Sequence, residues 1–282
     1  MNHSPSSGPQ GPTAYPSLAG RPIIVTGGGQ GIGRHMALAL AERGANVLIT
    51  AARDTSSLNE TVALAAGLDG NVISLQADIR DLNACERTVA FALSEFGGIA
   101  ALVNNAARGI AYVRETTGGH AVPFWETDRS RWAETITTNI IGTFQMSAVA
   151  CAYMTGQGFG RIVNVSTSDR SMVRAMNSPY GPSKAALEAM SVGWAIEGET
   201  RGVAVNVLLP GGATDTRMIT GVSKRVPLPP DIMNASILWL CSDASNGCTG
   251  GRYKADDWDE TLAPALAASC ARQPSHDLPV IM

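Results

Sequence analysis

PIIVTGGGQGIGRHMALALAERGANVLIT, residues 22–50, sets the architecture of this chain. It joins two short apolar runs, 22–26 and 46–50, through a glycine-rich turn and a segment with helical periodicity. Two strands linked by one helix form a right-handed βαβ unit with parallel strands. Glycines let the backbone turn sharply and approach a phosphate, and the following helix offers free amides and the positive end of its dipole. The stretch predicts a parallel sheet with a phosphate-binding turn after its first strand, and an ordinary tight turn is the alternative.

The alternation of strands and helices continues along the chain. Further apolar runs predict strands at 71–76, 99–103, 160–166 and 202–209, and helical patterns lie at 35–43, 83–96, 131–154 and 182–200. The strands are apolar along their whole length, as expected when helices cover both faces of a sheet. The predicted fold class is therefore α/β: a doubly wound, Rossmann-type parallel sheet flanked by helices in a single domain. In such sheets the ligand lies beyond the carboxyl ends of the strands.

Composition suggests where this domain begins and ends. Residues 1–19 are rich in Pro, Ser and Gly and are expected to form a flexible tail. The domain itself is assigned to residues 20–260. Residues 261–282 are expected to form a C-terminal extension with a helix in its alanine-rich part.

The charge and cysteine content exclude several classes of function. The chain has 282 residues, of which 45% are hydrophobic and 16% charged, and its formal net charge is −3. Without a basic block, binding to nucleic acid or to a membrane surface has no electrostatic support. The five cysteines are scattered without metal-ligand spacing, so no metal site is expected and a reducing compartment is favoured. No apolar run has the length of a membrane span or the position of a signal peptide, so we expect a cytoplasmic protein.

A tyrosine and a lysine stand four residues apart in Tyr180-Gly181-Pro182-Ser183-Lys184, at the start of a predicted helix. This spacing brings both side chains to one face of the helix, about one turn apart. A free tyrosine has a pKa of about 10 and is a poor base near neutrality. A neighbouring ammonium favours the phenolate and lowers that pKa toward the working range. The pair predicts an acid/base group, and a surface helix pair is the alternative.

The spacing TGxxxGxG in Thr26–Gly33, followed by Asn104-Asn105-Ala106-Ala107 and the tyrosine–lysine pair, resembles the short-chain dehydrogenase/reductase family from Arg21 to about Trp258. The resemblance implies an NAD(P)-dependent enzyme that transfers hydride between the dinucleotide and a carbonyl or secondary alcohol. It also places a last strand at 249–253. The residues that it assigns to the cofactor are Gly27, Gly29, Gln30, Gly31, Ile32, Gly33, Arg53, Asp78, Ile79, Asn105, Ala106, Tyr180, Lys184, Pro210, Gly211, Thr214 and Thr216.

The resemblance also assigns four catalytic roles. Tyr180 is the proton donor, and Lys184 holds the nicotinamide ribose and biases the tyrosine. Thr167 stands thirteen positions before Tyr180, where the family has a serine that polarises the carbonyl. Ser166 and Ser168 can take that role if the loop register differs. Asn139 resembles the helix asparagine that resupplies protons through a water at a local helix irregularity, and local packing is the alternative for it.

The end of the second predicted strand bears on the choice of cofactor. An acidic residue there binds the ribose hydroxyls of NAD, whereas an arginine pairs with the 2′-phosphate of NADP. This chain has Ala51 at the position of the NAD-selecting acid, and Arg53 follows two residues later. NADP(H) is therefore favoured and NAD(H) remains possible, with a solvated surface arginine as the alternative for Arg53.

The substrate is expected to be a small carbonyl or alcohol compound. Residues 108–126 are longer than the family usually has after the fourth strand, so they either line the substrate pocket or form an exposed excursion. Arg170 and Arg174 lie between Thr167 and Tyr180 and can meet an anionic substrate or stay at the surface. A homo-oligomer is expected because members of the family commonly pack through long helices. The alternative function is a catalytically silent dinucleotide-binding sensor or scaffold.

Overall fold

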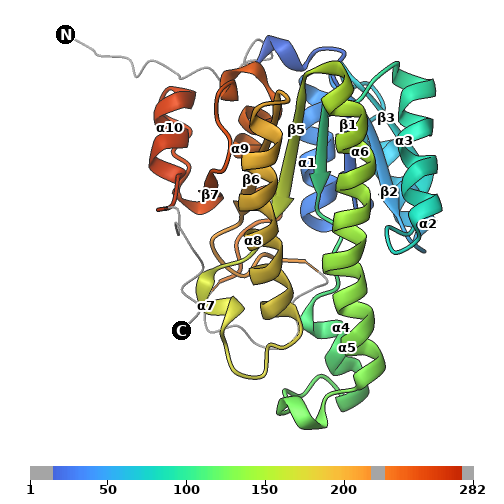
Figure 1. Ribbon diagram of the computed structural model, residues 1–282, viewed down its shortest axis with the longest axis vertical. Coiled ribbons are helices and arrows are strands. Elements are labelled where there is room, and N and C mark those ends of the chain that lie inside the picture. Colours follow the sequence, from blue (N-terminus) through green and yellow to red (C-terminus); the bar gives the residue numbers. More distant parts are fainter. Residues whose placement is uncertain (1–14, 217–225, 275–282) are drawn as a thin grey trace.

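Seven parallel strands form one sheet within residues 15–216 and 226–274, which the computed structural model describes (Figure 1). Their order is β3-β2-β1-β4-β5-β6-β7, and every neighbouring pair is parallel. The strands are β1 Pro22–Thr26, β2 Asn46–Ala51, β3 Asn71–Gln76, β4 Ala101–Asn104, β5 Gly160–Val165, β6 Val203–Leu209 and β7 Arg252–Lys254. The predicted doubly wound α/β sheet is confirmed.

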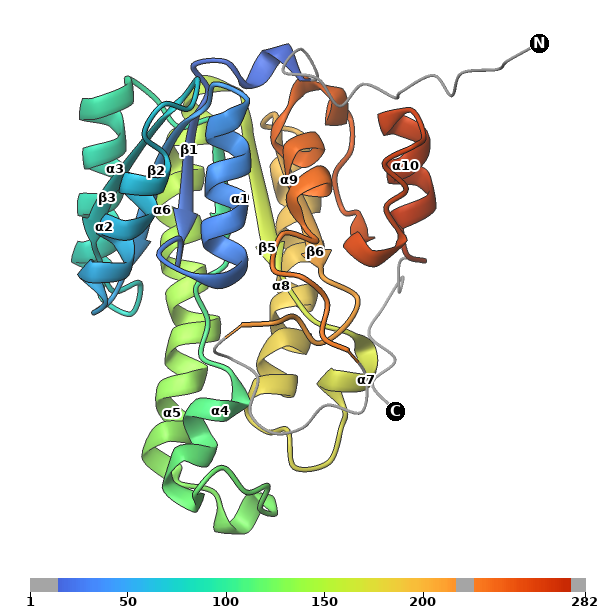
Figure 2. The same cartoon turned by 180° about the vertical axis from the view of Figure 1, so that it is seen from behind.

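Helices cover both faces of this sheet. Those that frame it are α1 Gly31–Glu42, α2 Thr55–Leu64, α3 Leu82–Phe96, α6 Thr143–Gln157, α8 Tyr180–Glu199 and α9 Asn234–Cys241. Shorter helices lie beyond the sheet or at its edge: α4 Ile110–Arg114, α5 Arg129–Ile136, α7 Asp169–Met172 and α10 Pro264–Ala271. Figure 1 shows α3, α6 and α8 in front of the sheet, and Figure 2 shows α1 and α9 on the opposite face.

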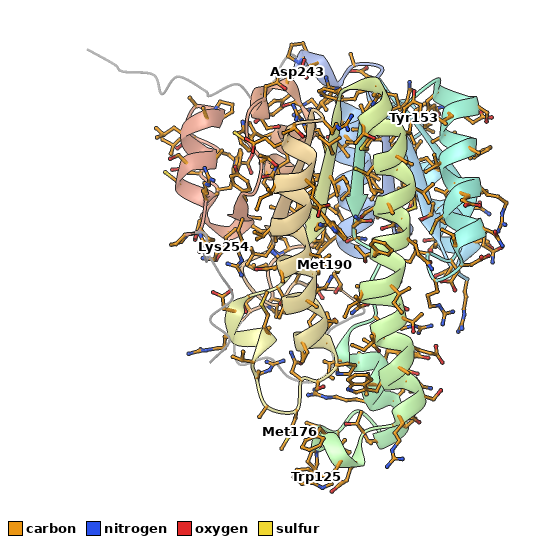
Figure 3. The ribbon with its side chains drawn as sticks, viewed as in Figure 1. Trp125, Tyr153, Met176, Met190, Asp243 and Lys254 are labelled. Carbon is orange, nitrogen blue, oxygen red and sulfur yellow. The ribbon has the colours of Figure 1, made fainter. Side chains whose placement is uncertain are left out.

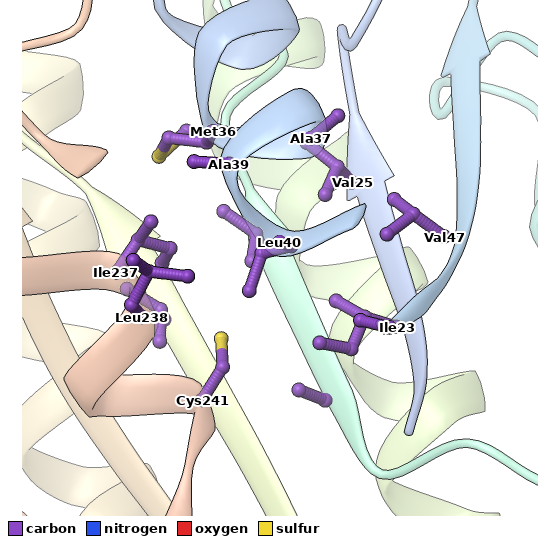
Figure 4. Close-up of a cluster of buried hydrophobic side chains, with 14 of the residues drawn as sticks. Ile23, Val25, Met36, Ala37, Ala39, Leu40, Val47, Ile237, Leu238 and Cys241 are labelled. Atoms are coloured by element: carbon purple, nitrogen blue, oxygen red, sulfur yellow. The ribbon is translucent and has the colours of Figure 1, made fainter. Parts of the chain in front are cut away.

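Two buried clusters fill the space between the sheet and its helices. On one face, side chains of β1 and β2 pack against α1 and α9 (Figure 4). Their members include Ile23, Val25, Val47, Met36, Leu40 and Ile237. On the other face, Leu102 of β4 and Ile162 of β5 pack against the inner sides of α3 and α6. Burial of both strand faces explains why the strands are apolar along their length.

The strand order places the functional site. The chain runs outward from β1 to β3, then crosses to β4 on the other side of β1, where Val25 pairs with Val103. The carboxyl ends of β1 and β4 therefore diverge into a crevice, which is where such sheets bind their ligands. In Figure 1 the arrowheads point down toward this end, beyond which α4, α5 and α7 lie.

The structure differs from the expected domain boundary at the amino-terminal end, and the helix expected in the C-terminal extension is present. Pro16–Leu18 form a helical turn whose Leu18 is fully buried in the core, so the fold begins before residue 20. The predicted tail from 1 to 14 lies outside the described residues. Helix α10 buries Ala267, Ala268 and Ala271, and residues 261–274 are therefore packed onto the domain. The three-part division of the chain otherwise stays a prediction.

Two helical elements also differ from the sequence patterns. The predicted helix at 131–154 is divided into α5 and α6 by a π-helical turn, Thr137–Gly142. The second helix, α2, lacks a predicted counterpart, although Asp54 caps it by accepting a hydrogen bond from the Ser57 amide. Among the described helices, none is long and apolar enough to span a membrane.

Candidate active site

The glycine-rich turn is held against the end of β4. Asn105 donates from Nδ2 to the carbonyl oxygens of Thr26 and Gly27, at 3.0 Å each. A Cβ at Gly33 would lie 2.3 Å from the Gly27 oxygen and 2.4 Å from Asn105 Nδ2. Only glycine fits this position, so the turn and the first residues of α1 form a close-packed cradle at the mouth of the crevice.

Arg34 of α1 and Thr61 of α2 hold the other side of the same turn. Arg34 donates from Nε and Nη2 to the Gly29 oxygen, at 2.9 and 2.6 Å. Thr61 donates from its hydroxyl to the carbonyl oxygens of Gly28 and Gly29, at 3.3 and 3.1 Å. With its carbonyls occupied by the protein, the turn keeps its orientation when its amides face a ligand.

Two cavities adjoin at the carboxyl ends of the strands. The first has a volume of about 700 Å³ and lies along the glycine turn. Its lining contains the predicted cofactor residues Gly27, Gln30, Gly31, Ile32, Gly33, Arg53, Asp78, Ile79, Asn105, Ala106 and Thr216. The second, about 690 Å³, shares Thr216 with the first and is lined by the predicted Thr167, Tyr180, Lys184, Pro210, Gly211 and Thr214. Gly29 and Asn139 line neither cavity.

Thr167 and Tyr180 meet in the second cavity. Thr167 follows β5 and Tyr180 opens α8, and the Thr167 hydroxyl lies close enough to Tyr180 to lower the pKa of the phenol. Ser166 turns away and donates to Glu188 Oε1 at 2.6 Å. Among the hydroxyls considered at this loop, Thr167 is therefore the one that the structure places beside the tyrosine. Burial raises the pKa of Tyr180, while the Thr167 hydroxyl and the charge of Arg174 lower it to a smaller extent.

Lys184 lies one helical turn below the tyrosine and is 4% exposed. Its ammonium donates to the carbonyl oxygen of Val165 at 2.7 Å. Burial lowers the pKa of Lys184 to about 8. The expected lowering of the Tyr180 pKa by this lysine is not seen, because desolvation of the phenol outweighs the charges around it.

Asn139 lies in the π-helical turn and is fully buried behind the cavity. It donates from Nδ2 to the Arg108 oxygen and to Ser183 Oγ, both at 3.0 Å, and its Oδ1 accepts from the Arg108 amide at 2.8 Å. The irregularity expected at this asparagine is therefore present. Its amide group is occupied in tying residue 108 to the first turn of α8, which the sequence did not indicate.

Comparison with known proteins identifies the family to which this chain belongs. Residues 21–226 match the family model described as short chain dehydrogenase. The chain is a short-chain dehydrogenase/reductase. It is 30% identical over 257 residues to the short chain dehydrogenase/reductase astE of Aspergillus oryzae, covering 85% of this chain and 95% of that protein. It is 31% identical to the L-rhamnose 1-dehydrogenase (NAD(P)(+)) of Azotobacter vinelandii, covering 85% and 96%.

Solved structures agree with this placement. A putative short-chain alcohol dehydrogenase from Sinorhizobium meliloti 1021 superposes with a TM-score of 0.74 at 29% identity, covering 86% of this chain and 96% of that one. Xylitol dehydrogenase with bound NAD+ superposes with a TM-score of 0.73 at 23% identity, which shows the common fold. Proteins of this family act on small molecules with NAD(P)(H), and this chain has the corresponding oxidoreductase fold.

Arginines surround the end of the short-chain dehydrogenase/reductase cleft that lies away from Tyr180. Most of them are paired: Arg34 with Glu60 at 2.9 Å, Arg80 with Asp78 at 2.7 Å, and Arg108 with Glu134 at 3.1 Å. Arg53 is exposed and forms no ion pair with any residue in the described ranges. It is the cation of this lining that is open to an incoming anion.

The resemblance to the family makes Asp78 an adenine-contacting residue, but in the structure its carboxylate is already bound by Arg80. Arg80 donates to both of its carboxylate oxygens, and these hydrogen bonds hold the pKa of Asp78 below its usual value. Any contact between this carboxylate and an adenine must therefore share the oxygens with Arg80.

The remaining features of the cleft fit a dinucleotide. The glycine cradle leaves no room for a Cβ at Gly33, which allows close approach of a pyrophosphate to the backbone. The Thr214 hydroxyl is buried and has no hydrogen-bond partner among the described residues. A polar ligand group in the cavity that Thr214 lines would satisfy it.

An ion pair between α8 and β7 lies behind Thr167, and the sequence did not indicate it. Glu188 lies one turn beyond Lys184 on α8 and accepts from Arg252 Nε of β7 at 2.9 Å. Arg252 also donates to the Thr167 carbonyl oxygen at 3.2 Å. Burial raises the pKa of Glu188. The two partners are 64 positions apart, so no local pattern signals their contact.

Proposed function

We propose that this short-chain dehydrogenase/reductase transfers hydride between NADP(H) and the carbonyl or secondary alcohol of a small molecule. The observation that carries the proposal is that Thr167, Tyr180 and the buried Lys184 line one cavity, which adjoins the cavity along the glycine turn. A scaffold that only binds a dinucleotide has no use for a second cavity that places two hydroxyls side by side.

The side chains divide the work of the reductive direction as follows. The bound nicotinamide supplies the hydride. Thr167 and Tyr180 hold the carbonyl oxygen through their hydroxyls, and Tyr180 releases its proton to that oxygen. Burial keeps the tyrosine protonated at neutral pH, which suits a proton donor. Lys184, with a pKa of about 8, carries a proton near neutrality and holds the ribose side of the cleft.

We assign Asn139 to positioning rather than to proton transfer through its amide. All polar atoms of that amide are engaged with Arg108 and Ser183. The asparagine thereby fixes the residue 108 segment against the first turn of α8. A water that resupplies protons at the π-helical turn would use backbone carbonyls there.

Arg53 supports NADP(H) over NAD(H). It is unpaired among the described residues, lines the cavity after β2, and stands near Ala51, which offers no carboxylate to ribose hydroxyls. An arginine binds a 2′-phosphate through charge-assisted hydrogen bonds. The name of the L-rhamnose relative includes NAD(P)(+), so that protein is credited with either dinucleotide.

We also propose a cytoplasmic homo-oligomer. Helices α6 and α8 expose apolar side chains: Phe144 is 51%, Val192 47% and Ile196 68% exposed. Phe144 stacks near Trp194, with ring centroids 6.3 Å apart, so the two helices share this apolar face. A second copy covering the face would remove that surface from water.

The test combines cofactor titration with one variant. We expect purified protein to bind NADPH at low micromolar concentration and more tightly than NADH. Turnover on a panel of carbonyl compounds should fall by at least a hundredfold in Tyr180→Phe, because general acid catalysis contributes on the order of 10² or more. NADPH should still bind to that variant at micromolar concentration, so the loss of turnover would not come from a loss of the cofactor. Binding without turnover on any compound would favour the silent sensor, and failure to bind either dinucleotide would refute the proposal.

A further inference from the structure

The cavity that holds Thr167 and Tyr180 has an uneven distribution of charge. Its described lining contains the cations Arg114, Arg174 and Lys184 and no aspartate or glutamate. Lys184 is directed into the protein at Val165. The two arginines therefore leave a positive charge in the part of the cavity that is available to a substrate.

Arg114 ends α4, in the long segment between β4 and α5, and is half-buried. It donates from Nη2 to the Met176 carbonyl oxygen at 2.9 Å. Its Nε is buried and has no hydrogen-bond partner among the described residues. Burial and the charge of Arg174 both lower the pKa of Arg114. Leaving a buried donor of a half-buried guanidinium without a partner is costly, so a ligand that supplies an acceptor and a counter-charge would bind there favourably.

Arg174 comes from the loop that joins α7 to α8. Its Nη2 donates to Asn177 Oδ1 at 3.2 Å, and it meets no carboxylate within the described ranges. Its charge lowers the pKa of Arg114 and also that of Tyr180, so it lies close to both. Met176 of the same loop lies at the end of the molecule beyond the sheet (Figure 3). Arg174 thus lines the same cavity as Tyr180 and Arg114 and is exposed there.

We propose that Arg114 and Arg174 form an anion subsite, and that the substrate is a carbonyl or alcohol compound that carries a carboxylate or a phosphate. This inference rests on the proposed hydride transfer and names its substrate class. Guanidinium groups bind both anions with paired charge-assisted hydrogen bonds. With its alcohol carbon at Thr167 and Tyr180, such a compound would direct its anionic group toward Arg174.

The test measures binding to the enzyme in the presence of saturating NADPH, which allows an alcohol to bind without turnover. The probes are 4-(hydroxymethyl)benzoate, 4-(hydroxymethyl)phenyl phosphate and the neutral methyl ester of the first. We expect at least one anion to bind about tenfold or more tightly than the ester, as charge-assisted hydrogen bonds allow. Comparison of the two anions distinguishes a carboxylate from a phosphate site.

Variants connect the preference to the two arginines. Arg174→Gln and Arg114→Gln should each weaken the preferred anion about tenfold and leave the affinity for the ester unchanged. Arg170→Gln is the matched control, because Arg170 is exposed on α7 and does not line the cavity. Arg114→Lys keeps the charge and should retain part of the anion affinity.

The outcomes separate this inference from the function on which it rests. Loss of NADPH binding in the unaltered protein would refute both. NADPH binding with equal affinities for acid, phosphate and ester would overturn the anion subsite alone. Equal weakening of anions and ester in both glutamine variants would also overturn it, since the arginines would then only brace the loop at Met176 and Asn177.

Discussion

Burial controls the protonation of the two residues that most closely define the site. Tyr180 and Lys184 are both shifted toward their neutral forms, the first upward and the second downward in pKa. Desolvation disfavours the charged form of either group, and no nearby carboxylate compensates the lysine fully. The protein thus keeps a neutral phenol one helical turn from an ammonium that loses its proton above about pH 8.

The pKa of Lys184 predicts a pH-dependent stability. Its folded value of about 8 is below the ordinary value of 10.5. Between these values the unfolded chain binds the proton and the folded chain does not, so the free energy of unfolding rises with pH. Relative to Lys184→Met, the unaltered protein should gain up to about 1.4 kcal/mol per pH unit from pH 8 to 10. Urea unfolding at several pH values measures this, and a difference that stays constant would contradict it.

At the residue scale, a contact could be predicted only where its two partners lie close together in the sequence. The tyrosine–lysine pair and the hydroxyl thirteen positions earlier were visible because their spacing is short. The contact of Glu188 with Arg252 was not, since only the fold brings α8 to β7. The sequence likewise did not indicate that Arg114 and Arg174 line the same cavity. Arg170, raised beside Arg174 from the sequence, does not line the cavity.

Among the elements, the turn between β1 and α1 tolerates the least change. Gly33→Ala would place a methyl group within 2.3 Å of the Gly27 oxygen, which is tied to Asn105. Overpacking of this kind should lower the free energy of unfolding by about 1–3 kcal/mol. Because the turn must shift, NADPH binding should weaken at least tenfold, as a loss of about 1.4 kcal/mol would give.

Gly156→Ala is the control for that substitution. Gly156 lies in α6, and a Cβ there meets no atom within 4 Å. Replacing it should leave NADPH binding unchanged and raise stability by about 0.5–1 kcal/mol, the usual gain in helix propensity. Thermal unfolding and NADPH titration of both variants decide the point. Equal behaviour of the two alanine variants would contradict the role given to the cradle.

The elements themselves were largely readable from periodicity and turn chemistry. Five of the strands expected between the glycine turn and Leu209 begin or end within a few residues of the predicted positions because each is a continuous apolar run. The π-helical turn was not readable at that level. It forms where Asn139 reaches the backbone of Arg108, a contact between distant segments.

At the scale of the whole molecule, the apolar face on α6 and α8 predicts self-association. Sedimentation velocity should show a dimer or a larger assembly at micromolar concentration. Ile196→Asp should shift the distribution toward monomer, because it places a charge in the centre of the covered face. Leu64→Asp on α2 is the matched control, since Leu64 is 57% exposed outside that face. A monomer in the unaltered protein would contradict the prediction.

The overall architecture was predictable because a parallel sheet follows from alternating strands and helices. The limits of the domain were not, since composition suggested a tail up to residue 19. Leu18 is fully buried because its helical turn packs onto the core at the amino ends of the strands. A single leucine among prolines and serines does not indicate such packing in the sequence.

Arg252 is synthesised after the residues of the site that it supports. A ribosome makes the glycine turn, Thr167 and Tyr180 before it makes Arg252, which fixes the Thr167 backbone from the last strand of the sheet. Chains begin to fold from their amino-terminal part while translation continues. A nascent polypeptide that stops short of residue 252 holds both reacting hydroxyls but lacks the guanidinium that anchors one of them. The Thr167 loop can therefore gain this hydrogen bond only after residue 252 has been synthesised.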